Sequence, residues 1–172
     1  MRNVKFIVLA FLFYASIASA TDIYTDTTID SGTWPGNTNV YNTAKLTVTG
    51  GDILSISVFD SSIIDVFGGA IDIIFVTDLE HATINLYGGE LTGFHGIFGS
   101  SNAINIYGYN FTEWQDGQNA YLSGTWEDNT GFEFYFLRSD GLPDIVTLYT
   151  VPEPTTILLF TLGGFLLRRT CK

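Results

Sequence analysis

Two series of side chains recur at a fixed spacing in the middle of the sequence, and they are the first candidates for chemistry. The aromatic series consists of Phe67, Tyr87 and Tyr107. The polar series lies two positions earlier in each copy and consists of Asp65, Asn85 and Asn105. Exposed aromatic rings can stack on the apolar faces of sugars, so the aromatic series is a candidate carbohydrate-binding strip. Aromatic neighbours also stabilise strands without any ligand, which leaves a purely structural role open.

The acidic and histidine residues do not form a catalytic or metal-binding pattern. Glycoside hydrolysis needs two carboxylates at a set separation, whereas Asp65 is a single carboxylate within the polar series. A β-helical polysaccharide lyase would use a Lys or Arg base, and Lys45 and Arg138 lie outside the repeat. His81 and His95 have neither His-x-x-x-His spacing nor a third ligand. We expect no catalytic residue, metal or cofactor, with a weak polysaccharide-active enzyme based on Asp65 as the alternative to test.

The elements that position these residues are repeats of a short strand followed by glycine. The copies occupy residues 46–51, 64–69, 84–89 and 104–109. Aliphatic residues alternate with polar or aromatic ones in each copy, as in a strand with one buried face. The glycine after each strand permits a positive φ, which can turn the chain at a corner. A period of about 20 residues is typical of one coil of a β-solenoid, in which strands of successive coils pair in parallel.

We therefore predict a small, single-domain, all-β protein, built as a parallel β-solenoid of about four coils. The second strands of the coils are expected at 53–59, 71–76 and 91–98. A C-terminal cap that includes a β-hairpin is expected from strands at 112–118, 120–126, 132–138 and 144–149 with a turn at 127–131. Residues 22–42 would cap the other end less regularly. A β-sandwich is the alternative, because short strands with glycine turns also suit that fold.

The segment between Thr21 and Glu153 is strongly acidic. It contains all 18 acidic residues but only Lys45 and Arg138 as basic residues, so its net charge is near −16. Such a surface repels phosphates, which excludes nucleic acid as a partner. The single cysteine, Cys171, leaves no disulfide framework, so stability must come from packing.

Residues 1–20 have the three zones of a secretory signal peptide. A positively charged start precedes an apolar run at 6–17, and Ala18 and Ala20 then suit signal peptidase. We expect an N-terminal signal helix, export, and a mature chain that begins at Thr21. The alternative is a membrane-anchoring helix, although the apolar run is shorter than the roughly 20 residues that span a bilayer.

Residues 151–172 combine a short motif, an apolar stretch and a basic pair. The motif is Val151, Pro152, Glu153 and Pro154, and the basic pair after the apolar stretch 155–167 is Arg168 and Arg169. By the positive-inside rule, an apolar helix followed by basic residues keeps its C-terminus in the cytoplasm and everything before it outside. A buried C-terminal helix or strand of the domain is the alternative interpretation.

This C-terminal segment resembles the PEP-CTERM sorting signal, although its apolar stretch is short and Thr-Cys-Lys follows the arginine pair. The resemblance implies that an exosortase, a membrane-embedded cysteine transpeptidase of Gram-negative bacteria, recognises Pro152, Glu153 and Pro154. Arg168 and Arg169 would correspond to the retention cluster. Family members are commonly linked to exopolysaccharide and biofilm. The resemblance thus implies transient inner-membrane anchoring and then a place on the cell surface or in the matrix, but no activity.

The sequence therefore predicts three parts: a signal peptide (1–20), an acidic β-repeat domain (21–150) and a sorting segment (151–172). We expect an exported, non-catalytic surface or matrix protein that is processed by signal peptidase and an exosortase. The alternative is a carbohydrate-binding module that uses Phe67, Tyr87 and Tyr107. Extracellular polysaccharide is the candidate ligand in either case.

Overall fold

The computed structural model describes residues 20–77, 81–96, 98 and 101–152, and these residues are all-β. The signal helix and the hydrophobic C-terminal helix that the sequence predicts lie outside them. The strands are β1 (Thr21–Ile23), β2 (Thr27–Ile29), β3 (Thr33–Val40), β4 (Lys45–Val48), β5 (Asp52–Val58), β6 (Ile63–Val66), β7 (Ala70–Val76), β8 (Thr83–Leu86), β9 (Glu90–Gly96), β10 (Ala103–Gln115), β11 (Asn119–Thr125), β12 (Gly131–Leu137) and β13 (Val146–Thr150).

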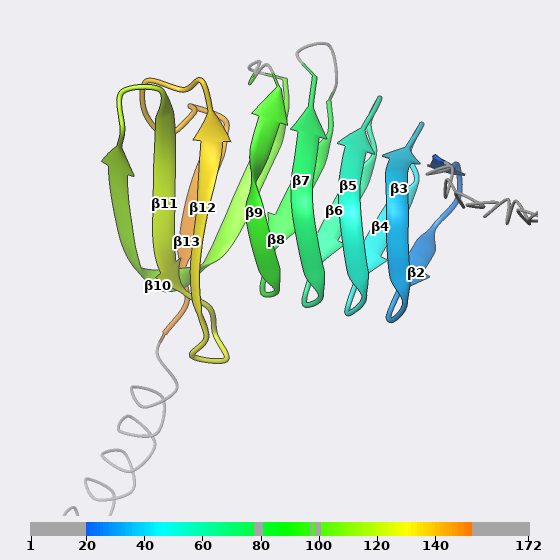
Figure 1. Cartoon of the computed structure of the whole chain (residues 1–172), viewed down its shortest axis with the longest axis horizontal. Helices are drawn as coiled ribbons and strands as arrows, with labels where there is room; N and C mark the ends of the chain where they lie inside the picture. The colour runs from blue at the N-terminus through cyan, green and yellow to red at the C-terminus, as the bar shows by residue number, and fades with distance from the viewer. Residues whose placement is uncertain (1–19, 78–80, 97, 99–100, 153–172) are drawn as a thin grey trace, which may run out of the picture.

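The strands form two layers that run along the long axis of the molecule (Figure 1). The front sheet has the order β1-β3-β5-β7-β9-β12-β11-β10, and the back sheet has the order β2-β4-β6-β8-β10-β13. Each coil gives one strand to each sheet, and strands of successive coils pair in parallel. This is the predicted parallel β-solenoid, and the parallel pairing rules out the β-sandwich alternative.

Aliphatic side chains from the two sheets fill the space between them. The residues predicted to point inward from the repeated strands are all buried: Leu46, Val48, Ile64, Val66, Ile84, Leu86, Ile104 and Ile106. Because paired strands are in register, each of these residues stacks on its equivalent in the next coil. The alternation seen in the sequence therefore becomes continuous apolar columns, which supply the core of a domain without disulfides.

Pairs of glycines form the corners after β4, β6 and β8, and the two members differ in backbone conformation. Gly69 has a φ of 84°, a conformation that L side chains rarely adopt. A Cβ on Gly68 would lie 2.9 Å from the carbonyl oxygen of Thr49 in the preceding coil. The second glycine thus permits the turn, and both glycines permit close stacking, since a Cβ on Gly69 would lie 2.8 Å from the Gly51 carbonyl oxygen.

The N-terminal segment is more regular than the sequence predicted. The expected irregular cap at 22–42 instead contains β1, β2 and β3, which pair in parallel with the strands that follow. Residues 27–29 are a short copy of the repeat, and their Ile29 is buried in the same column as Val48. The predicted second strands of the other coils are confirmed as β5, β7 and β9.

The C-terminal cap adds a further rung to the solenoid instead of only covering its end. β10 leaves the back sheet and continues in the front sheet, where it pairs antiparallel with β11. β12 then pairs antiparallel with β11 and parallel with β9, so it is inserted between them. The predicted hairpin turn is confirmed by a 2.9 Å hydrogen bond from the Trp126 amide to the Thr130 carbonyl.

Candidate functional site

The aromatic series on the back sheet forms a ladder of stacked rings. Phe67 and Tyr87 have ring centroids 4.6 Å apart, and Tyr87 and Tyr107 have centroids 4.4 Å apart. Tyr149 extends the ladder at 4.7 Å from Tyr107. The sequence indicated the first three members, but it did not indicate Tyr149, because β13 follows the antiparallel insertion and not the period of the coils.

Face-to-face stacking limits what this back ladder can offer to a sugar. The faces of Tyr87 and Tyr107 are covered by their neighbours, since the planes of successive rings differ by only 5°, 15° and 11°. Phe67 and Tyr149 end the ladder and are 52% and 44% exposed. Sugar stacking on the series stays a prediction, and the geometry restricts it to these two end rings.

A second stacked ladder at the opposite corner points to the same structural use of aromatic rings. Tyr24, Tyr41 and Phe59 follow the ends of three successive front strands, with centroids 5.0 and 4.7 Å apart. Rings stacked in this way stabilise adjacent strands by about 0.2–1 kcal/mol per pair. Stacked ladders are therefore a packing device that this solenoid uses at two corners.

The polar series is a hydrogen-bonded network on the back sheet. Asn85 donates from Nδ2 to Oδ1 of Asp65 at 2.7 Å, and Asn105 donates from Nδ2 to Oδ1 of Asn85 at 2.8 Å. Lys45 Nζ lies 2.5 Å from the other carboxylate oxygen of Asp65. The hydrogen bond and the charge of Asp65 raise the pKa of Lys45. Both oxygens of Asp65 are thus engaged within the protein.

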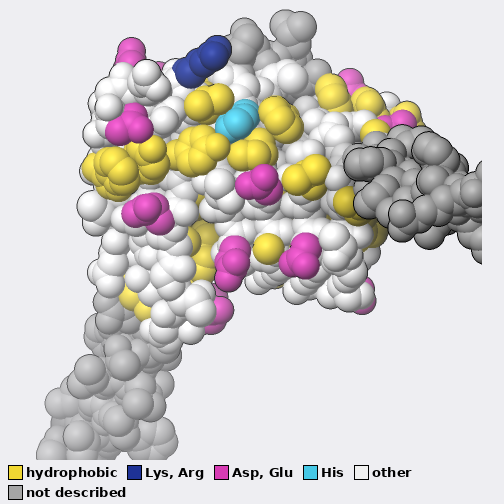
Figure 2. Space-filling model, in the orientation of Figure 1, with side chains coloured by type: hydrophobic (Ala, Val, Ile, Leu, Met, Phe, Trp, Pro, Cys, Tyr) yellow, Lys and Arg dark blue, Asp and Glu magenta, His cyan; other side chains and the backbone are white. Residues whose placement is uncertain are grey.

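The front sheet carries a band of aromatic side chains that the sequence did not reveal. We define the front aromatic band as Trp114, Tyr121, Tyr135, His95 and Phe75, one from each of five neighbouring strands. Successive ring centroids lie 3.8, 6.1, 5.7 and 5.6 Å apart. Figure 2 shows hydrophobic side chains gathered across this face around a histidine. At about 4.8 Å per strand, the band is about 19 Å long.

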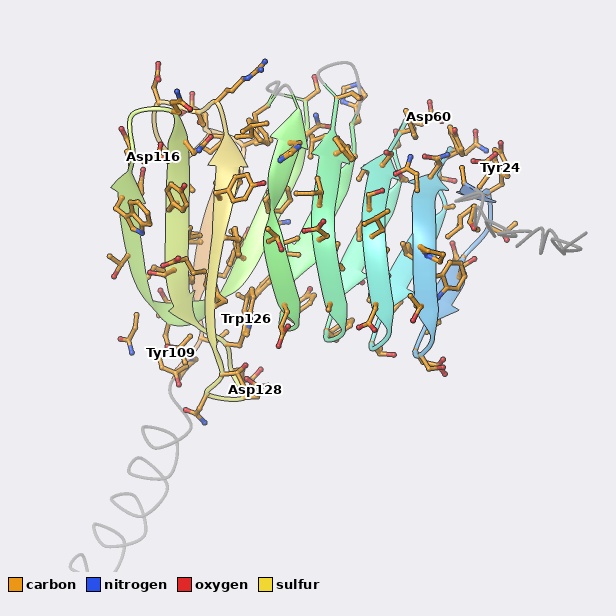
Figure 3. The ribbon with its side chains drawn as sticks, in the orientation of Figure 1. Tyr24, Asp60, Tyr109, Asp116, Trp126 and Asp128 are labelled. Atoms are coloured by element: carbon orange, nitrogen blue, oxygen red, sulfur yellow. The ribbon has the colours of Figure 1, made fainter. Side chains whose placement is uncertain are left out.

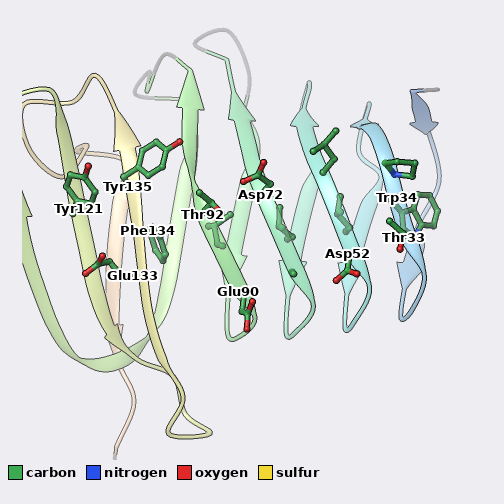
Figure 4. A pocket seen from close by; sticks show the side chains of 16 residues that line it. Thr33, Trp34, Asp52, Asp72, Glu90, Thr92, Tyr121, Glu133, Phe134 and Tyr135 are labelled. Carbon is green, nitrogen blue, oxygen red and sulfur yellow. The ribbon is translucent and has the colours of Figure 1, made fainter. Parts of the chain in front are cut away.

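Trp114 and Tyr121 are stacked, with ring planes only 3° apart, but the other neighbouring rings of the front aromatic band do not cover one another. The planes of Tyr121 and Tyr135 differ by 53°, those of Tyr135 and His95 by 46°, and those of His95 and Phe75 by 87°. Figure 4 shows the Tyr135 ring nearly face-on above β12. A hydrogen bond of 2.9 Å between the Tyr135 hydroxyl and His95 Nε2 holds two of these rings in place. This band therefore presents aromatic faces to a ligand in a way that the back ladder does not.

Asp116 fixes the Tyr121 end of the band. It lies at the turn between β10 and β11, as Figure 3 shows, and its Oδ2 accepts a 2.9 Å hydrogen bond from the Tyr121 hydroxyl. The backbone amides of Gln118 and Asn119 donate to its other oxygen. These hydrogen bonds, the amide ones first, lower the pKa of Asp116 to about 2. The carboxylate thus remains charged and positions the Tyr121 ring.

A groove of about 820 Å³ adjoins the band and crosses the front sheet. It begins at Trp34 on β3, passes over β5, β7 and β9, and ends at Tyr121 and Tyr135 (Figure 4). Five strand spacings of about 4.8 Å give it a length of about 24 Å.

The groove follows an irregularity that the coils share. In β5 the inward residues Ile53 and Ile56 are three positions apart instead of two, and both are buried. Ile71 and Ile74 repeat this spacing in β7. Two successive residues between them are therefore displaced from the core face, at the level where the groove lies.

Carboxylates are the charged groups of the groove. The acidic lining residues are Asp52, Asp72, Glu90 and Glu133. Asp52 and Glu90 each pair with Ala70, one on either side, so they share a column two strands apart. The described lining contains no Lys or Arg. Lys45 is paired with Asp65 on the back sheet, and Arg138 lies beside a separate hollow. The described residues contain no group of three or more His, Cys, Asp or Glu that could hold a metal ion.

The predicted targeting residues fall only partly within the described chain. Ala20 precedes β1, Thr21 begins it, and Val151 and Pro152 follow β13. The other predicted targeting residues, Ala18, Glu153, Pro154, Arg168 and Arg169, lie outside the described residues. The described part of the chain holds no helix of the length and hydropathy needed to cross a membrane.

No family model, curated protein or solved structure matches this chain. The geometry of the front sheet and the targeting motifs of the sequence are therefore the features that bear on function.

Proposed function

We propose that this chain is an exported, non-catalytic protein of the cell surface or extracellular matrix that binds an extended polysaccharide with its front sheet. The observation that carries the proposal is the long groove with aromatic rings at both ends. A polysaccharide lying along the solenoid axis would cross one strand about every 4.8 Å, which is close to the length of one sugar in an extended chain. Consecutive sugars would thus meet equivalent positions of consecutive coils.

The carboxyl groups support binding rather than glycoside cleavage. A general acid for this reaction needs a raised pKa, because it must hold a proton at neutral pH. Hydrogen bonds lower the pKa of Asp116 and of Asp128, so neither of these two residues suits that role. Asp65, the candidate catalytic carboxylate of the alternative enzyme function, is engaged in an ion pair with Lys45 and a hydrogen bond from Asn85.

The delivery of the protein is the second part of the proposal. Signal peptidase removes residues 1–20, and an exosortase acts at Pro152, Glu153 and Pro154 after transient anchoring in the inner membrane of a Gram-negative bacterium. The Val151 amide still donates to the Gly108 carbonyl at 2.9 Å, so paired backbone extends to the residue before the motif. Processing beyond that point would leave the paired strands intact.

Retention on neutral polysaccharide tests the binding proposal and separates the two aromatic surfaces. The exported protein is passed over immobilised polysaccharides as wild type, as Trp114→Ala/Tyr135→Ala and as the matched back-sheet variant Phe67→Ala/Tyr149→Ala. We expect the front-sheet variant to lose at least about tenfold in affinity, because a stacking contact contributes about 1 kcal/mol per ring. The back-sheet variant should bind as wild type does. Equal binding by wild type and the front-sheet variant would exclude the proposed surface, and selective loss in the back-sheet variant would favour the Phe67 ladder.

A further inference from the structure

We infer that the groove of the front sheet selects glycans that carry ammonium groups, such as a partly deacetylated amino-sugar polymer. The inference rests on the proposed function, because it names the class of polysaccharide that the front sheet binds. Its basis is the combination of an elongated groove, aromatic ends and a charge of one sign.

The charge of the groove discriminates between classes of glycan. Four carboxylates and no Lys or Arg line it, as far as the chain is described. A uronate polymer would bring further carboxylates next to these side chains, and the like charges would repel. A fully neutral chain would offer hydroxyl and amide donors to the carboxylates but no opposite charge, so its hydrogen bonds to them would be weaker. An ammonium group supplies both a hydrogen-bond donor and the opposite charge.

The placement of the carboxylates fits a chain that is only partly deacetylated. Asp52 and Glu90 begin β5 and β9, while Asp72 lies further along β7 (Figure 4). Asp52 and Glu90 are two strands apart, which is about 9.6 Å. A chain with one sugar per strand therefore meets a carboxylate on this line at alternate sugars. Ala70 lies between them, and Leu54 lies further along β5; both are apolar surfaces that can contact the methyl groups of remaining acetyl substituents.

A basic peptide is the competing occupant, and the strand pairing argues against it. Extended peptides commonly bind by adding a strand to an open sheet edge. β5, β7 and β9 are hydrogen-bonded to neighbours on both sides, so the middle of the groove presents side chains and no free backbone edge. A ligand there must be held by ring stacking and by contacts with side chains, which suits a glycan.

The test compares ligands of equal length and different charge on the full exported protein. The probes are chitosan hexamer, its fully acetylated counterpart, a hexauronate and a hexalysine peptide, measured by calorimetry near pH 5.5, about one unit above the ordinary pKa of Asp and Glu. We expect chitosan to bind at least about tenfold more tightly than the acetylated hexamer and the peptide, and the hexauronate not to bind. Added salt should reduce this preference, because exposed charges are screened.

Matched variants decide whether the groove or the overall negative charge is responsible. Asp72→Asn/Glu90→Gln removes two charges from the groove, and Asp140→Asn/Asp144→Asn removes two from the exposed loop before β13. The groove variant should lose at least about tenfold in chitosan affinity and keep its affinity for the acetylated hexamer, while the loop variant should match wild type. Equal losses in both variants, equal affinities for the two amino-sugar hexamers, or tighter binding of the peptide would overturn the inference. If the acetylated hexamer still binds through Trp114 and Tyr135, the proposed function survives that result; if no glycan binds, both fail.

Discussion

Three glycines allow the cost of backbone strain in the corners to be separated from the cost of close packing. Gly117 has a φ of 88°, and a Cβ there would have no atom within 4 Å. Gly69 has almost the same φ, 84°, but a Cβ there would lie 2.8 Å from the Gly51 carbonyl oxygen. Gly68 does not have a positive φ, and its Cβ would lie 2.9 Å from the Thr49 carbonyl oxygen. Alanine at Gly117 therefore introduces backbone strain alone, and alanine at Gly68 introduces a steric clash alone. Alanine at Gly69 introduces both.

The expected losses of unfolding free energy follow from these geometries. Left-handed backbone costs an L residue about 1–2 kcal/mol, and the smaller entropy of the unfolded alanine chain offsets about 0.4–1 kcal/mol of this. Gly117→Ala should therefore cost about 0–1.5 kcal/mol. An extra methyl group in a packed site costs about 1–3 kcal/mol, so Gly68→Ala should lie in that range and Gly69→Ala near about 2–4 kcal/mol.

Urea unfolding followed by circular dichroism measures these free energies, provided that the transition is two-state. The order should be Gly69→Ala as the most costly and Gly117→Ala as the least. If Gly69→Ala costs no more than Gly117→Ala, close stacking of the coils does not require the glycine pair, and the two tasks assigned to the corner glycines are refuted.

Three further predictions concern the cap and the tail. Trp126 is 2% exposed and donates from Nε1 to the Gly89 carbonyl, so Trp126→Ala should destabilise the fold by about 3–5 kcal/mol in the same urea assay. A loss below about 1 kcal/mol would show that Trp126 does not close the core. The pKa of Asp116 falls from 3.8 to about 2 on folding, so its stabilising contribution is complete above pH 3.8 and disappears as the pH falls toward 2. Asp116→Asn should therefore flatten the dependence of the unfolding free energy on pH in that window, and an unchanged dependence would contradict this. Pro152→Ala/Pro154→Ala should leave the C-terminal segment attached, which an intact-mass measurement of the exported protein detects. If the variant loses the same mass as wild type, recognition of the motif is ruled out.

The regular part of the solenoid could be predicted because its information is local and repeated. An inward Ile64 or Ile84 is specified by alternation within a short strand, and the period then places it above its equivalent in the next coil. The N-terminal coil was missed because residues 27–29 retain only a short form of the pattern, and Ser31-Gly32 stands where later coils have two glycines.

The front aromatic band could not be predicted because it depends on pairings between distant strands. Alternation in residues 119–125 and 131–137 is enough to place Tyr121 and Tyr135 on one face of a hairpin. Nothing in the period indicates that β12 inserts beside β9, which is what brings Tyr135 next to His95. The groove was missed for a related reason, since the shift between Ile53 and Ile56 interrupts the simple alternation used to assign faces.

The pairing of β13 also determines how the molecule would respond to a pulling force at its C-terminal end. Five consecutive residues, Val146–Thr150, lie in parallel register with residues 104–108 of β10. Tension applied beyond Val151 acts along β13, so the hydrogen bonds of this register are loaded together in shear and are not opened one after another. For a protein held at the surface by its C-terminal segment, the last strand would thus act as a mechanical clamp that passes load from an anchor into the stacked coils.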